Sequence, residues 1–281
     1  MGKMYNECKD IIESCTTGLD NSAIECLTIG FLSLYLLKED YVLERLPKLL
    51  LNTSILRGDS DDVKLSIDLL DEDDESKVVN SLTIPKNINI SSYRKVIDGI
   101  IFNLIALLRF REVKKNNNAL DVYQGISIKH INKDTGFVST RNKNMELAIT
   151  SVIASEAHNE LIKYLSDEYD DAIPTEHYAC LVGSTTKIYN IFAKIIMDFM
   201  EDGKFRDLVN ASFDRVNGKE FAREYNRIMD NDAAFANLNI LFDKLGNAIR
   251  NEDEENVSKC ITLIYDEMSS FSNKNNHFRK A

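Results

Sequence analysis

The chain has 281 residues, of which 44% are hydrophobic and 28% charged, a composition typical of folded globular proteins and not of disordered ones. Its formal net charge of −11 excludes a surface covered throughout by nucleic acid or anionic lipid, although it leaves room for a local basic patch. Only 3 Pro and 11 Gly interrupt the chain, which favours long helices over a turn-rich sandwich or barrel.

The first residues predict two helices, at 3–15 and 21–51. One of the polar residues 20–22 is expected to cap the second helix, because their side chains can accept hydrogen bonds from its first backbone N–H groups. Pro47 is expected to break this helix or to begin a further turn, since proline lacks the N–H that an interior helical position donates.

Residues 63–69 place apolar side chains at every second position, which predicts a strand. The acidic stretch 71–77 is interpreted as a polar turn, and 78–90 as one or two short strands around Pro85. A helix is predicted at 94–113, and its middle is apolar on nearly all sides. Such a helix belongs in the centre of a core.

A β-hairpin is predicted where two β-branched runs, 120–131 and 137–141, flank the sequence NKDTG, in which Gly136 would take the left-handed conformation. The same turn contains DTG, the tripeptide of retroviral-type aspartic proteases. Those enzymes need an apolar lead-in and a small residue after the glycine, whereas Phe137 follows here. The tripeptide is therefore interpreted as a turn.

From residue 142 to the end the pattern is almost entirely helical, with apolar side chains at helical spacing. Four stripes are expected to face a core: Met145, Ala148, Ile149, Val152, Ile153, Ala157, Leu161 and Leu165; Ile188, Ile191, Phe192, Ile195 and Phe199; Phe235, Leu238, Leu241, Phe242, Leu245 and Ile249; Val257, Ile261, Ile264, Met268 and Phe271. Each stripe needs a partner that buries it, which predicts a helical bundle.

These patterns predict a mostly α fold, with an α+β part at residues 1–141 and an all-helical bundle at 142–281. The first part would contain two short β-hairpins or a small antiparallel sheet. Whether the two parts are separate domains or share one continuous core stays open.

Membrane insertion and secretion are not expected. The apolar runs 24–37 and 96–110 are shorter than the about 20 residues of a membrane span, and each contains a carboxylate. The five cysteines are odd in number and form no C-x-x-C pair, which predicts free thiols in a reducing compartment. We therefore expect a cytoplasmic protein, and a composition rich in Asn, Ile and Lys suggests a viral, phage or mobile-element source.

Few residues indicate catalysis. Asp68, Glu75 and Lys77 follow the order found in metal-dependent nucleases, where two carboxylates hold a cation and a lysine lies beside the attacked phosphate. Because Glu75 lies in an acidic run, a solvated loop is the favoured interpretation.

The four histidines show no metal-ligand spacing, so no metal or other cofactor is expected. His158 and His177 each follow a carboxylate closely and are expected on a helix surface or at a cap. The sequence GSTTK at 183–187 lacks the order of a phosphate-binding loop and is interpreted as a helix cap.

Charge is distributed unevenly. Residues 109–143 contain eight basic and three acidic residues, a net charge of +5 that leaves −16 on the rest of the chain. Cations and an exposed aromatic ring can contact phosphates and stack a base. The candidate residues for binding nucleic acid or another anion are Arg109, Arg111, Lys114, Lys115, Lys129, Lys133, Phe137, Arg141 and Lys143.

The register of the hairpin decides how these cations are arranged. A loop spanning 132–136 would place Lys129 and Arg141 on one face, with Phe137 exposed at the tip and Val138 facing the core. A four-residue loop would instead move Arg141 to the apolar face. Because that alternative would bury a charge, the first register is favoured.

Two simpler interpretations remain open. The cations at 109–115 would complement the dipole at the C-terminus of the predicted helix. Basic residues on a hairpin edge also discourage edge-to-edge aggregation. The favoured function is a non-enzymatic assembly or binding protein that self-associates or forms complexes, with nucleic acid, an acidic protein or another copy of the chain as candidate partners. The alternative is a metal-dependent nuclease or another phosphate-directed enzyme.

Overall fold

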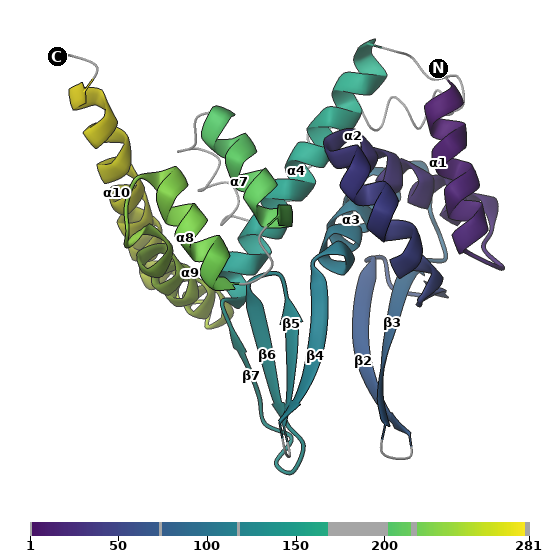
Figure 1. Cartoon of the computed structure of the whole chain (residues 1–281), viewed down its shortest axis with the longest axis horizontal. Coiled ribbons are helices and arrows are strands. Elements are labelled where there is room, and N and C mark those ends of the chain that lie inside the picture. Colours follow the sequence, from purple (N-terminus) through teal and green to yellow (C-terminus); the bar gives the residue numbers. More distant parts are fainter. Residues whose placement is uncertain (1, 73–74, 117–118, 168–201, 215–217, 279–281) are drawn as a thin grey trace. The chain divides into compact units, whose positions relative to one another are not determined.

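The structure of the protein, a computed structural model, describes residues 2–72, 75–116, 119–167, 202–214 and 218–278. These residues form eight helices, one three-stranded sheet and one four-stranded sheet (Figure 1). Every described element that begins after residue 142 is a helix. The predicted class, mostly α with an α+β part, is confirmed.

The chain packs into two compact units, and each unit takes residues from both sides of residue 141. The described residues of the first unit lie within 1–108 and 153–188, and those of the second lie within 109–152 and 189–281. Helix α4 (Lys143–Asp167) therefore contributes its first turns to the second unit and the remainder to the first. The two units do not test the predicted domains at 1–141 and 142–281. That division stays a prediction.

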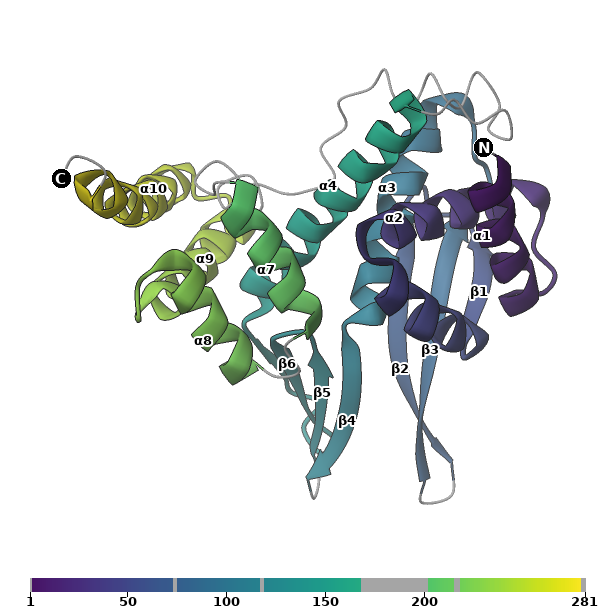
Figure 2. The same cartoon turned by 45° about the horizontal axis from the view of Figure 1, so that its top comes forward.

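The first unit begins with α1 (Gly2–Cys15) and α2 (Asn21–Leu51). The backbone N–H of Ala23 donates to Asp20 Oδ1 at 2.9 Å. Asp20, one of the three residues predicted to cap this helix, is therefore its N-cap. Figure 2 shows these helices and α3 gathered beside the three-stranded sheet.

Pro47 does not break α2, so the first of the two predicted outcomes is wrong. The helix continues to Leu51, and its non-helical backbone lies at Lys38 instead, with φ −155° and ψ 72°. The carbonyl that Pro47 leaves without its helical donor belongs to Leu43, which is 39% exposed. This turn of the helix therefore lies at the surface.

The three-stranded sheet contains β1 (Thr53–Gly58), β2 (Lys64–Glu72) and β3 (Glu75–Pro85) in the order β1-β3-β2. β1 runs parallel to β3, and β2 runs antiparallel to it. The chain reverses within the predicted turn at 71–77, but the turn is shorter than predicted, because the antiparallel pairing of β2 with β3 extends to residues 72 and 75. Antiparallel strands tolerate charged residues where one face is solvated, so charge alone did not mark the turn.

Helix α3 (Ile90–Leu108) forms the core of the first unit, as predicted, and packs against α2. The two helices approach closely at Gly30, where an added Cβ would lie 2.5 Å from Ile100 Cγ2. The predicted end at residue 113 is wrong. The chain leaves the helix after Leu108 because long-range pairing with β5 overrides local helix propensity. Arg109 directly follows the helix, and the cations at 111–115 lie in the next strand and not at a helix end.

The four-stranded sheet of the second unit is antiparallel throughout (Figure 1). Its strands are β4 (Phe110–Asn116), β5 (Ala119–Gln124), β6 (Ser127–Asn132) and β7 (Val138–Arg141), in the order β4-β5-β6-β7. The run predicted as one strand at 120–131 is therefore two strands. Gly125 allows the intervening tight turn with φ +54°.

Helices α7, α8, α9 and α10 complete the described part of the second unit, with bounds Asp202–Asp214, Gly218–Met229, Ala234–Arg250 and Glu254–Phe278. All the apolar residues predicted for the stripe at 145–165 are buried, which confirms that prediction. In the third stripe Ile249 is 44% exposed, contrary to prediction, because it lies in the last turn of α9. The stripe at 188–199 and the predicted cap at 183–187 lie outside the described residues.

Candidate binding surface on the four-stranded sheet

A buried ion pair fixes the base of the four-stranded sheet. Arg109 Nε and Nη2 donate to the two carboxylate oxygens of Glu146 at 2.7 and 2.8 Å, and the two side chains are 2% and 9% exposed. The backbone N–H of Ile126 donates to the same carboxylate at 2.9 Å, and Arg109 Nη1 donates to the carbonyl of Ser212 at 2.5 Å. A bidentate pair with these additional partners is a structural anchor. Arg109 therefore does not belong to an exposed anion-binding surface.

Arg111 also bonds within the unit. Its guanidinium donates to the carbonyl of Gly125, and it lies at an irregularity in the pairing of β4 with β5. Burial, followed by repulsion from Arg109, lowers the pKa of Arg111. Its side chain is half-buried and holds the turn between β5 and β6, so little of it is left for a partner.

Lys114 is exposed and paired. Its Nζ lies 3.0 Å from Glu112 Oε1 and 5.3 Å from the centre of the Tyr123 ring. The hydrogen bond to Glu112 raises the pKa of Lys114. The side chain of Lys115 lies outside the described residues. On this face the cation is thus matched locally by a carboxylate, as expected for a solvated sheet face.

Five residues, 133–137, lie between β6 and β7, and a backbone hydrogen bond closes a loop of four of them, 133–136. The backbone N–H of Asn132 donates to the carbonyl of Phe137 at 2.9 Å, and the Asn132 side chain accepts from two backbone N–H groups inside the turn. Gly136 has φ +66°, the predicted left-handed conformation. The DTG sequence is therefore part of an exposed turn, as predicted.

The favoured hairpin register is wrong by one residue. Arg141 lies opposite Ile128, and Thr140 lies opposite Lys129. Because cross-strand partners share a face of a sheet, Lys129 and Arg141 lie on opposite faces. The observed register was disfavoured because it would bury a charge. All four residues of β7 are exposed, however, so neither face of the sheet is covered at this edge.

An exposed edge remains at β7, where several of the candidate cations are open to solvent. Phe137 is 63% exposed, and Val138, predicted to face the core, is 49% exposed because β7 is the outermost strand (Figure 1). Asp134 is the acidic residue of the adjoining turn. We define the basic edge as the exposed residues on and beside β7: Lys129, Lys133, Phe137, Val138, Arg141 and Lys143.

The first unit contains a second group of ionisable side chains, which is buried. Asp98 Oδ1 lies 3.1 Å from His158 Nδ1, and Asp98 Oδ2 lies 3.2 Å from Arg94 Nε. His158 is 5% exposed, so its predicted place on a helix surface or at a cap is wrong. The contact with His158 lacks hydrogen-bond geometry, and neither ring nitrogen has a hydrogen-bond partner among the described residues. Among the described residues, Asp98 is thus paired with Arg94, and the His158 ring lies beside this pair.

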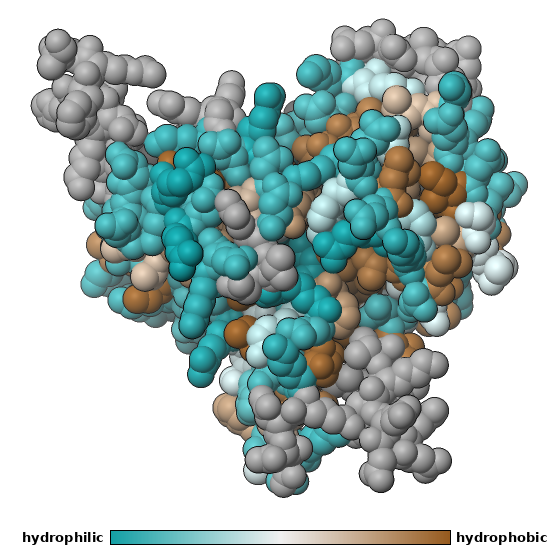
Figure 3. Space-filling view, viewed as in Figure 1, coloured by the Kyte–Doolittle hydropathy of each residue, from teal (hydrophilic) through white to brown (hydrophobic). Residues whose placement is uncertain are grey.

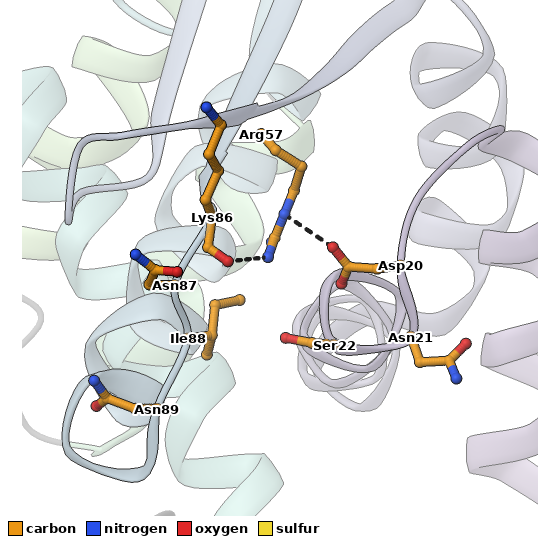
Figure 4. Close-up of a pocket in the computed structure, with 8 residues that line it drawn as sticks. All are labelled: Asp20, Asn21, Ser22, Arg57, Lys86, Asn87, Ile88 and Asn89. Atoms are coloured by element: carbon orange, nitrogen blue, oxygen red, sulfur yellow. Dashed lines mark hydrogen bonds and ion pairs between the residues drawn. The ribbon is translucent and has the colours of Figure 1, made fainter.

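An open pocket lies between the start of α2 and the segment before α3 (Figure 4). Arg57 points into it, with Nε 3.2 Å from Asp20 Oδ2 and Nη2 2.7 Å from the carbonyl oxygen of Lys86. The Nζ of Lys86 lies 2.9 Å from Asp59. Each cation at this pocket is already matched by a carboxylate, so the pocket has no excess charge that would select an anion.

The residues of the nuclease alternative lie on the hairpin of β2 and β3. Position 68 pairs with 79 and position 72 with 75. Positions 68 and 75 are therefore four residue pairs apart, roughly 13 Å along the strands, which does not favour one shared cation. In the part of the chain that the structure describes, no group of three or more His, Cys, Asp or Glu side chains has an arrangement that could hold a metal ion. His177 lies outside that part.

Hydrophilic residues dominate the face shown in Figure 3, and hydrophobic residues reach the surface in separate groups. None of the described helices combines the length and the apolar character that a membrane span requires. Compared with known protein families, curated proteins and solved structures, the chain shows no significant match. Its function must therefore be argued from its own side chains.

Proposed function

We propose that the protein is a non-enzymatic assembly or binding protein that holds an acidic macromolecular partner on the basic edge. The observation that supports this most directly is the exposure of β7, whose four residues are all open to solvent beside the exposed Phe137 ring. Burying a large aromatic side chain contributes about 1.5–3 kcal/mol. The Phe137 side chain is 63% exposed, so covering it with a partner would contribute much of this free energy to binding.

The charge of the basic edge selects the partner. Lys129, Lys133, Arg141 and Lys143 are exposed around β7, and Asp134 is the acidic residue in the turn. Complementary charge speeds association and excludes partners of like charge. Because residues outside 109–143 carry a net −16, another copy of this chain is one candidate partner, beside nucleic acid and acidic proteins.

Binding can be tested with two labelled acidic probes, a polyglutamate peptide and an oligothymidylate of about 15 nucleotides, a length near the upper site size of single-strand binding domains. Lys129→Glu with Arg141→Glu is compared with Arg223→Glu with Lys259→Glu, which reverses two exposed cations on α8 and α10. Both variants change the net charge equally.

We expect the variant of the basic edge to weaken binding of at least one probe about tenfold, equivalent to 1.4 kcal/mol, and the control variant to weaken it much less. Binding should also fall as salt rises to about 0.5 M, because exposed charges are screened. Sedimentation of the protein alone tests self-association. A monomer that binds neither probe, or equal effects of the two variants, would show that the proposal is wrong.

A further inference from the structure

We infer that the partner on the basic edge is an acidic, extended polypeptide segment, which adds to β7 as a further strand of the four-stranded sheet. This inference rests on the proposed function and specifies its partner. Strand addition requires unpaired backbone groups along a sheet edge, and specificity requires side chains that flank the added strand. The described residues of the second unit provide both.

The backbone of β7 has free groups on its outer side. One backbone bond, from the N–H of Asn132 to the carbonyl of Phe137, sets the phase of the ladder at this end, while the Phe137 N–H donates to Thr135 Oγ1. In an antiparallel ladder hydrogen-bonded pairs alternate with pairs whose N–H and C=O groups point away from each other. The observed register then directs the backbone groups of Ser139 toward β6 and those of Val138 and Thr140 outward. No described residue forms a hydrogen bond with these outward groups.

The side chains beside this edge place positive charge on both faces of the sheet. Arg141 lies on the same face as Phe137, whereas Lys129 lies beside Thr140 on the other face. An added strand also directs its side chains alternately to the two faces. Adjacent carboxylates in that strand would therefore meet Arg141 on one face and Lys129 on the other. Phe137 lies four residues before Arg141. In an added strand, an apolar residue four positions from the carboxylate that faces Arg141 would therefore cover the Phe137 ring.

This arrangement suits an acidic polypeptide better than a nucleic acid. Single-stranded nucleic acids lie along a positively charged groove and stack bases on aromatic rings. Here Lys129 and Arg141 face opposite sides, and the groups between them are backbone donors and acceptors that match another strand. Pairing β7 with β7 of a second copy would bring cations of both copies to one edge, which is unfavourable. The same charges that repel such strands attract an acidic one.

The probe for this inference is the capped peptide Ser-Glu-Glu-Thr-Val-Phe-Ser, with a lysine version in place of the two glutamates as a charge control. A version N-methylated at alternate residues keeps the charges but cannot complete the ladder. In the full-length protein, Thr140→Pro removes one outward N–H and leaves every charge in place, and proline is tolerated at such edge positions. Thr140→Ala is the matched control that keeps the N–H.

We expect Thr140→Pro to weaken peptide binding about tenfold, equivalent to 1.4 kcal/mol, and Thr140→Ala to change it less than about twofold. The N-methylated and lysine peptides should not bind. Amide exchange measured by NMR should slow at Val138 and Thr140 when the acidic peptide is bound. If Thr140→Pro fails to fold, the N-methylated peptide and the amide exchange of the unmodified protein decide the question.

The outcomes separate this inference from the proposed function. If Lys129→Glu with Arg141→Glu abolishes peptide binding while Thr140→Pro leaves it unchanged, strand addition is wrong and the charged surface stands. If the oligothymidylate binds to this surface and the peptide does not, the inferred partner is wrong. Self-association that depends on Thr140 would identify a second copy as the occupant and overturn the inference. If neither probe binds, the inference and the proposed function fail together.

Discussion

Replacing Arg109 with methionine should destabilise the second unit strongly. The Arg109 and Glu146 side chains are 2% and 9% exposed, and two of the guanidinium nitrogens donate to the carboxylate. Methionine retains most of the side-chain volume but removes the charge, so Glu146 becomes a buried carboxylate without its cation. Removing one partner of a buried ion pair costs about 3–5 kcal/mol. We expect a loss of this size in the free energy of unfolding.

Urea unfolding followed by circular dichroism measures this loss, because the described elements of the second unit are largely helical. Lys114→Met removes an exposed cation from an exposed pair with Glu112 and should have a much smaller effect. Glu146→Gln added to Arg109→Met should restore part of the stability, because a neutral amide still accepts from the Ile126 N–H. A loss in Arg109→Met below about 1 kcal/mol, or one no larger than in Lys114→Met, would refute the reasoning.

Two further predictions concern stability and thiol reactivity. Gly136→Ala should cost about 1–2 kcal/mol for the left-handed backbone alone, because nothing lies near its added Cβ. Gly125→Ala should cost clearly more, since its Cβ would also collide with the Glu146 carboxylate, and equal losses in urea would contradict this. Burial raises the pKa of the Cys8 thiol to about 12, so at pH 8 it stays protonated and should react with iodoacetamide more slowly than the part-buried Cys15. Peptide mass spectrometry measures both rates, and equal labelling would show that Cys8 is accessible.

Local features of the fold could be predicted from the sequence. The stripe at 145–165 lies at helical spacing, and all the residues predicted for it are buried on α4. Gly136 occupies the predicted left-handed position, and Asp20 caps α2. In each case the pattern and the structure depend on residues a few positions apart, so the sequence alone contains the necessary information.

Long-range contacts explain what could not be predicted. Arg109 was grouped with the exposed cations because its partners, Glu146 and Ser212, lie 37 and 103 residues along the chain. The end of α3 was misplaced for a similar reason, since pairing with β5 recruits the residues after Leu108 into a strand. The segment 110–116 gives no period-two signal for a strand, because its apolar residues, Phe110 and Val113, are three positions apart.

The hairpin shows how one residue of register changes a candidate site. The same turn sequence permits a loop of 132–136 or of 133–136, and the bond between Asn132 and Phe137 selects the second. The apolar residues at alternate positions predict that one face of this hairpin is buried along its whole length. β7 is an edge strand with four exposed residues, so Arg141 remains in solvent in the observed register.

The central claim, that the basic edge is a binding surface, is tested most directly by an NMR titration of the full-length protein with the acidic peptide. We expect the amide shifts to change most at residues 137–143 and these changes to disappear in the Lys129→Glu, Arg141→Glu double variant. Unchanged shifts at 137–143, or larger changes at the pocket between α2 and α3, would contradict the claim.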